Sequence, residues 1–161
     1  MKRGTTRHPK MHHLADALDI PLSHAAGLMA CLWDLTADTK PEGDIGRASN
    51  RAIARELSWP EADAERLVNA IASAGFLDPH PTHRWVVHQW SEHCETGVHT
   101  FLARAKRRFA DGSTPKMSAL RSDERESAAK WYAENPFICS QTQVQGVSEE
   151  VPRTVQGQSK V

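Results

Sequence analysis

The apolar positions of two stretches near the N-terminus repeat every three to four residues. This spacing predicts amphipathic helices, each with one buried face. Pro21 and Ser23 stand between the two stretches and supply a start signal for the second helix. The apolar positions are Met11, Leu14, Ala15 and Leu18 in the first stretch and Ala25, Leu28, Met29, Leu32 and Leu35 in the second.

Residues 44–78 have the sequence DIGRASNRAIARELSWPEADAERLVNAIASAGFLD, which predicts two short helices separated by a turn. Ser49 or Asn50 can cap the first of these helices. The isolated Ile45 ahead of the cap could enter a short strand. The inward residues of this helix are expected to be Ile53, Ala54 and Leu57.

The second of these short helices is expected to run from Glu61 to Ala74. Pro60 disfavours helical geometry at Trp59 and suits the first turn of the helix that follows it. Gly75 then ends the helix as the residue beyond its cap. The expected inward residues are Ala64, Leu67, Val68 and Ile71, and the expected outward residues are Ala62, Glu65, Arg66, Asn69 and Ser73.

Beyond Gly75 the helical period gives way to short extended runs. Residues 76–78 and 84–88 predict two strands joined by a proline-containing loop, as in a β-hairpin. Helical patterns return at residues 91–110, which become basic toward their end, and at residues 122–133. Residues 135–161 are rich in Gln, Ser, Val and Gly without a regular period, so we expect them to be disordered.

The charges of the chain cancel, with 20 basic and 20 acidic residues, so only their local distribution bears on a nucleic-acid partner. Three cysteines without a CxxC pair predict reduced thiols rather than a disulfide framework. No segment approaches the roughly 20 apolar residues of a membrane span, and the basic N-terminus has no signal-type apolar stretch after it. We therefore expect a soluble, cytoplasmic protein without a membrane partner.

The order of the predicted elements is typical of a winged helix-turn-helix. The segments HPKMHHLADALDIPLSHAAGLMACLWDLT, GDIGRASNRAIARELSWPEADAERLVNAIASAGFLD and WVVHQWSEH resemble the N-terminal winged-helix module of bacteriophage replication initiators of the replisome-organiser, DnaD-like kind. The resemblance covers roughly residues 6–94, and its most telling pieces include LADAL, GDIGR, AGFLD and VVHQW. It implies DNA binding near a phage replication origin, or recruitment of replication proteins such as a helicase or a helicase loader.

The expected fold is mainly helical with a small β-hairpin. A winged-helix domain would span residues 6–94, a basic helical extension residues 95–134 and a flexible tail residues 135–161. The chain carries no nucleophile-elbow, P-loop or HExxH motif, so we expect neither an enzyme nor a cofactor. The unassigned face of the first helix could serve as a contact in a homo-oligomer.

A helix-turn-helix inserts its second helix into the major groove and braces its first against the DNA backbone. Arg66 and Asn69 are therefore candidates for reading guanine and adenine. Arg51 and Arg55 lie four residues apart, so they share one helical face that could follow the phosphates. The full set of candidate phosphate contacts is Arg47, Arg51, Arg55, His83, Arg84, Arg104, Lys106, Arg107 and Arg108.

The predicted recognition helix is also acidic, since Glu61, Asp63 and Glu65 accompany Arg66 and would repel phosphate. The arginines could instead pair with neighbouring acids, and the basic run at 106–108 could favour the negative end of a helix dipole. A transcriptional regulator and a protein–protein adaptor that uses the acidic helix are therefore alternatives to a replication protein.

Two other groups of residues are candidates for a functional role, one in zinc binding and one in base stacking. The segment HQWSEHCETGVH offers imidazole and thiolate ligands for zinc, but its spacing matches no standard zinc motif. The tryptophans are expected to pack in the core or at a hinge rather than to stack on bases. The residues concerned are His88, His93, Cys94 and His99, and Trp33, Trp59, Trp85 and Trp90.

Overall fold

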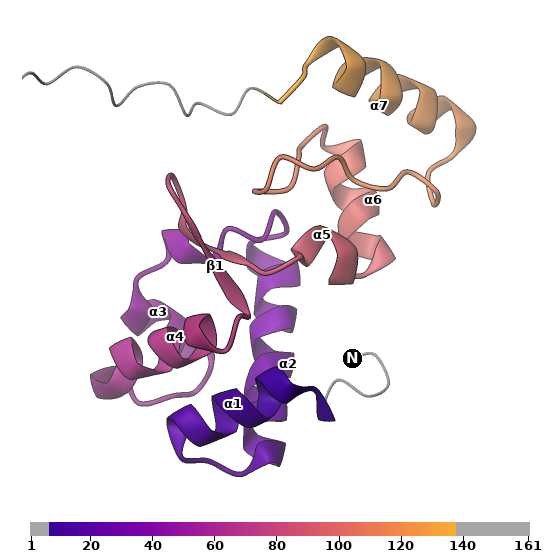
Figure 1. Cartoon of the computed structure of the whole chain (residues 1–161). Helices are drawn as coiled ribbons and strands as arrows, with labels where there is room; N and C mark the ends of the chain where they lie inside the picture. The colour runs from indigo at the N-terminus through magenta and orange to yellow at the C-terminus, as the bar shows by residue number, and fades with distance from the viewer. Residues whose placement is uncertain (1–6, 138–161) are drawn as a thin grey trace, which may run out of the picture.

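The computed structural model describes residues 7–137, so most of the expected tail lies outside the described residues. This part of the chain is mainly helical, with seven α-helices and one antiparallel two-stranded hairpin (Figure 1). The helices are α1 (Pro9–Leu18), α2 (Leu22–Thr39), α3 (Asn50–Glu56), α4 (Ala64–Ser73), α5 (Trp90–His93), α6 (Thr96–Arg104) and α7 (Ser122–Glu134), and the strands are β1 (Leu77–His80) and β2 (Arg84–Val87). Among residues 7–137, no helix has both the length and the apolar character needed to span a membrane.

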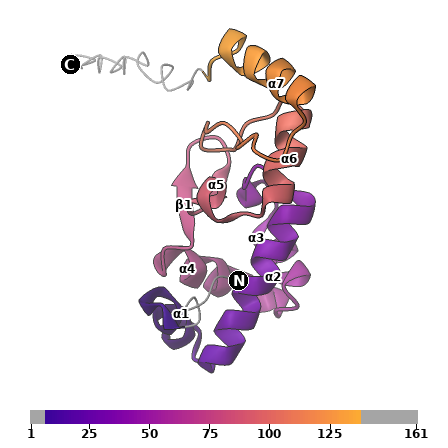
Figure 2. The same cartoon turned by 90° about the vertical axis from the view of Figure 1, so that its right-hand side faces the viewer.

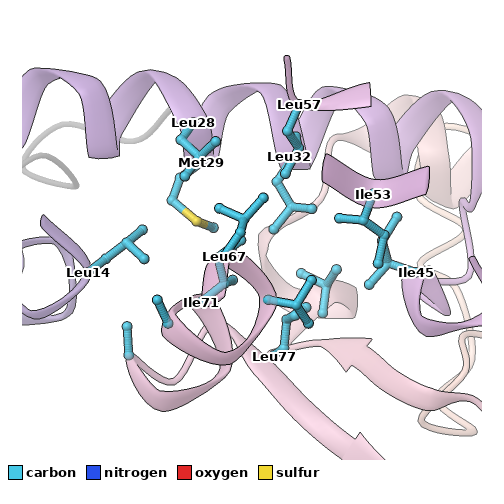
Figure 3. Close-up of a cluster of buried hydrophobic side chains, with 14 of the residues drawn as sticks. Leu14, Leu28, Met29, Leu32, Ile45, Ile53, Leu57, Leu67, Ile71 and Leu77 are labelled. Atoms are coloured by element: carbon cyan, nitrogen blue, oxygen red, sulfur yellow. The ribbon is translucent and has the colours of Figure 1, made fainter. Parts of the chain in front are cut away.

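The core forms where α1 and α4 pack against the long helix α2. Figure 3 shows Leu14 of α1, Met29 of α2, and Leu67 and Ile71 of α4 pointing toward one another. All four side chains are fully buried, and each contributes roughly 1.5–3 kcal/mol through the apolar surface removed from water. The predicted inward faces of the first two helices are confirmed, except that Leu35 is only half-buried.

Helices α3 and α4 form a helical hairpin around a tight turn. The Ser49 hydroxyl accepts a hydrogen bond from the Ala52 amide at 3.2 Å, which confirms the predicted cap of α3. Ser58 adopts a left-handed conformation (φ 54°) in the turn. The second helix begins three residues later than predicted, because residues Glu61–Asp63 wind as a tighter 3-10 turn, η3, before α4 starts.

Gly75 ends α4 as predicted. Its φ of 80° is left-handed, which glycine adopts without steric cost, and the Phe76 amide then closes back on the Ile71 carbonyl at 3.1 Å. This reversal directs the chain into β1, which pairs with β2 in the register Leu77 to Val87.

The expected short strand at Ile45 does not form. Residues Ile45–Arg47 make a 3-10 turn, η2, that lies against β2. A Cβ atom at Gly46 would stand 2.2 Å from the Trp85 amide nitrogen and 2.3 Å from the His83 carbonyl oxygen. Glycine, which has no Cβ, allows the η2 turn to lie this close to the hairpin, and the sheet keeps two strands.

The single helix expected over residues 91–110 is wrong, because Cys94 and Glu95 are extended and separate α5 from α6. Trp90 anchors α5 with an indole hydrogen bond to the Pro41 carbonyl at 2.9 Å. Helix α6 takes another direction and places Val98 and Leu102 in the main core. Because of this break, Trp90 can reach the Pro41 carbonyl while Val98 and Leu102 lie in the core.

Helix α7 matches the predicted helix at residues 122–133 to within one residue. It packs on α6 through a second, smaller apolar cluster of Ala103, Leu120, Ala128 and Tyr132. Helices α6 and α7 lie at the end of the molecule opposite α1 (Figure 2).

Candidate nucleic-acid interface

The outward faces of α3 and α4 display the side chains expected to contact DNA. Arg51 and Arg55 are exposed on α3, and Arg66 and Asn69 are exposed on α4. Packing of the opposite faces fixes both helices, since Ile53 and Leu67 are buried in the shared core.

The three acids of the second helix and its leading turn are each engaged by a neighbour. Arg55 donates to both carboxylate oxygens of Glu61, at 2.8 and 3.1 Å, and this hydrogen bonding lowers the pKa of Glu61. Arg66 pairs with Asp63 at 3.3 Å. The Asn50 amide donates to Glu65 at 2.7 Å. The acids are thus partly neutralised, but at the expense of two candidate DNA contacts.

Two of the candidates carry no such engagement. Within residues 7–137, the side chains of Arg51 and Asn69 are exposed and form no hydrogen bond or ion pair. The Arg55–Glu61 pair is also open to solvent, where water and salt screen the attraction between the two charges. Exchange of Glu61 for a phosphate at Arg55 would therefore cost little.

The candidates beside the β-hairpin form a local network. Arg47 pairs with Asp44 at 2.6 Å and also donates to Nδ1 of His83 at 3.3 Å. The His83 ring stacks on His80, with ring centroids 4.6 Å apart. Burial, followed by the charges of His80 and Arg47, lowers the pKa of His83. His83 is therefore neutral at neutral pH and supplies no positive charge for a phosphate.

Arg84 braces the hairpin. Its guanidinium donates to the carbonyl oxygens of Gly46 at 3.2 Å and Ala48 at 2.6 Å, so it ties β2 to the turn before α3. The residue also holds a left-handed backbone conformation (φ 65°), which is unfavourable for a long side chain. This geometry gives Arg84 a structural role.

The basic run at 104–108 is distributed over several contacts. Arg104 donates to both oxygens of Glu124 on α7, at 3.1 and 3.3 Å. Arg107 pairs with Glu42 in the loop after α2. Arg108 lies over the Tyr132 ring, 5.0 Å from its centroid. Helix α6 ends at Arg104, so residues 106–108 do not form the basic helix end that the sequence suggested, and Lys106 extends into solvent from a left-handed backbone (φ 55°).

Charge divides the described chain into two parts. Residues 7–95, which include α3 and α4, hold 13 acidic and 8 basic side chains and a net charge of −5. Residues 96–137, which include α6 and α7, hold 5 acidic and 8 basic side chains and a net charge of +3. The α3–α4 hairpin therefore belongs to the acidic part.

The cysteine and histidines of the zinc alternative are arranged differently from a metal site. Cys94 Sγ lies 3.5 Å from Nε2 of His99, whose Nδ1 accepts the Lys116 amide at 3.1 Å. Burial raises the pKa of Cys94 to about 11 and lowers the pKa of His99, so both groups are neutral. Residues 7–137 contain no group of three or more His, Cys, Asp or Glu side chains placed to hold a metal ion.

The tryptophans pack as expected. Trp90 is 5% exposed in the core, and Trp33, Trp59 and Trp85 are half-buried against it. None of these four side chains is fully exposed as a stacking platform for a base.

Sequence reasoning missed two surface features. The first is a groove between α1, α2 and α5 whose lining comes from segments far apart in the chain, so no local motif signals it. The second is Phe101 on α6, which is 51% exposed. Its exposure depends on the break before α6, which the helical period did not indicate.

Comparison of the chain with protein-family models, with curated proteins and with solved structures gave no match.

Proposed function

We propose that this protein binds duplex DNA through a winged helix-turn-helix in which α4 enters the major groove and α3 lies along the backbone. The observation that carries the proposal is the α3–turn–α4 hairpin, whose inner faces fill the core and whose outer faces present Arg51, Arg55, Arg66 and Asn69. An arginine and an asparagine on one exposed helix are suited to paired hydrogen bonds with guanine and adenine.

The adjacent β-hairpin supports the same reading. It follows α4 directly and is fastened to the turn before α3 by Arg84, as a wing beside a recognition helix would be. By the resemblance to phage replication initiators, the DNA contact would serve replication initiation or replisome assembly, with a helicase or a helicase loader as protein partner.

A protein–protein adaptor is the second candidate, because the same surface belongs to a part of the chain with a net charge of −5. DNA affinity depends largely on cations that replace condensed counterions, and Arg47, Arg55 and Arg66 already have acidic partners. An acidic, well-packed helix fits a basic protein surface.

Salt dependence separates the two candidates. Fluorescence anisotropy with labelled duplex and single-stranded DNA should be measured at about 50 and 200 mM salt, since phosphate contacts weaken steeply over this interval. DNA binding by α3 and α4 predicts duplex binding that falls with salt and exceeds binding to a single strand. Absence of duplex binding at low salt would contradict the DNA proposal and favour the adaptor.

A further inference from the structure

A groove of about 330 Å³ lies between α1, α2 and α5, within the size range of ligand sites, about 300–1,000 Å³. Its apolar lining includes Trp33, Phe76 and Trp90, and Trp33 meets Phe76 edge to face with centroids 6.3 Å apart. None of the candidate DNA contacts lines it, so the groove is separate from the proposed DNA surface.

Two carboxylates line the groove together with the ammonium of Lys10. Asp34 on α2 and Glu95 before α6 are exposed, and neither forms an ion pair within residues 7–137. Glu95 precedes α6 without capping it through its side chain. The lining therefore holds two carboxylates against the single ammonium of Lys10, which favours a cationic ligand.

The groove already holds one cation against an aromatic ring. The Lys10 ammonium lies 5.9 Å from the centroid of Phe76 and donates to the Gly75 carbonyl at 2.8 Å. Lys10 is thereby satisfied by Phe76 and by the end of α4, whereas Asp34 and Glu95 are not. Gln89, also at the groove, adopts a left-handed conformation (φ 47°), a strain often found at binding sites.

We propose that this groove binds an arginine side chain from a basic segment of a partner protein. A guanidinium is planar, stacks on indole rings and can donate two hydrogen bonds to a carboxylate at once. Trp33, which is half-buried, supplies the ring, and Asp34 and Glu95 supply the acceptors. Arginine binding in the groove does not depend on DNA binding. It involves none of the candidate DNA contacts, and the partner segment is positively charged whereas DNA is negatively charged.

The test is an NMR titration of the full chain with a blocked Gly-Arg-Gly peptide, beside a matched peptide that carries neutral citrulline. The arginine peptide should produce saturable shifts at the indole signals of Trp33 and Trp90 and at the amides of Phe76 and Gln89. The citrulline peptide should bind at least about tenfold more weakly, since it loses the charge-assisted hydrogen bonds.

Two double variants complete the experiment. Asp34→Asn with Glu95→Gln should abolish the arginine shifts, whereas Asp123→Asn with Glu126→Gln on α7 removes the same charge elsewhere and should retain them. Equal binding of both peptides, or equal loss in both variants, would overturn the proposal. If the shifts appear only after Lys2→Ala and Arg3→Ala, the chain's own basic N-terminal segment competes for the groove, and the assignment to a partner would be wrong.

Discussion

The acidic part of the molecule, residues 7–95, and the basic part, residues 96–137, divide between them the two requirements of a DNA-binding protein. The acidic part has the α3–α4 hairpin and the β-hairpin of the proposed DNA-binding surface, while the basic part has the net charge of +3 that suits phosphate. In both parts most arginines already bind an acid or a carbonyl. Among the candidate phosphate contacts on the helical hairpin, Arg51 is exposed and forms no hydrogen bond or close ion pair within residues 7–137, although its charge acts on nearby Glu61.

The largest expected effect tests whether the two parts unfold together. Leu102 of α6 is fully buried in the same core as α2 and α4. Leu102→Ala should lower the free energy of unfolding by about 2–5 kcal/mol through lost burial and the cavity left behind. Urea unfolding followed by circular dichroism should show one transition at a lower midpoint. A separate, early transition would mean that α6 and α7 unfold independently of the helical hairpin.

A smaller effect distinguishes structural from free arginines within the acidic part. Arg84→Ala removes hydrogen bonds to two backbone carbonyls and should cost about 1–3 kcal/mol, whereas Arg51→Ala should change stability by less than about 0.5 kcal/mol. Thermal unfolding of both variants measures the difference. Equal stability of the two variants would contradict a stabilising role for the Arg84 hydrogen bonds.

The smallest effect compares one histidine from each part. The pKa values of His83 and His99 are lowered, chiefly by burial. When the pKa of a histidine is lower in the folded state, the unfolded chain binds the proton more readily. The contribution of the neutral histidine to the free energy of unfolding is therefore fully present above about pH 6.5 and is lost as the pH falls below it. His99 is only 4% exposed and faces Cys94 and Lys116, while His83 is half-buried and faces Asp44, Arg47 and His80.

We therefore expect the free energy of unfolding to decrease between about pH 7 and pH 5.5, and His99→Gln to remove more of that decrease than His83→Gln. Urea unfolding at several pH values provides the measurement. A pH dependence that is unchanged in His99→Gln would show that this buried imidazole is not responsible.

The local signals of the sequence predicted the helical hairpin well. The Ser49 cap, Pro60 in the turn and Gly75 beyond α4 act on their immediate neighbours, and each is found in its expected place. The inner faces followed from the helical period, because burial in this core repeats with that period.

The errors arose where a distant contact decides the local structure. The η2 turn at Ile45 packs on the hairpin through Gly46, a contact that no neighbouring residue indicates. The break at Cys94 and Glu95 follows from the anchoring of Trp90 on the Pro41 carbonyl. The ion pairs of Arg55 and Arg104 likewise depend on where other elements place Glu61 and Glu124.

The most direct test of the account compares two double variants in the DNA-binding assay. Arg51→Ala with Arg55→Ala removes the charges on α3, and Arg121→Ala with Lys130→Ala removes the same number from α7 and the N-cap residue before it. The α3 variant should bind every duplex more weakly, by about tenfold or more, with a salt slope smaller by about 2, while the α7 variant should resemble the wild type. Equal affinity and salt slope in the α3 variant and the wild type would contradict binding through the helical hairpin.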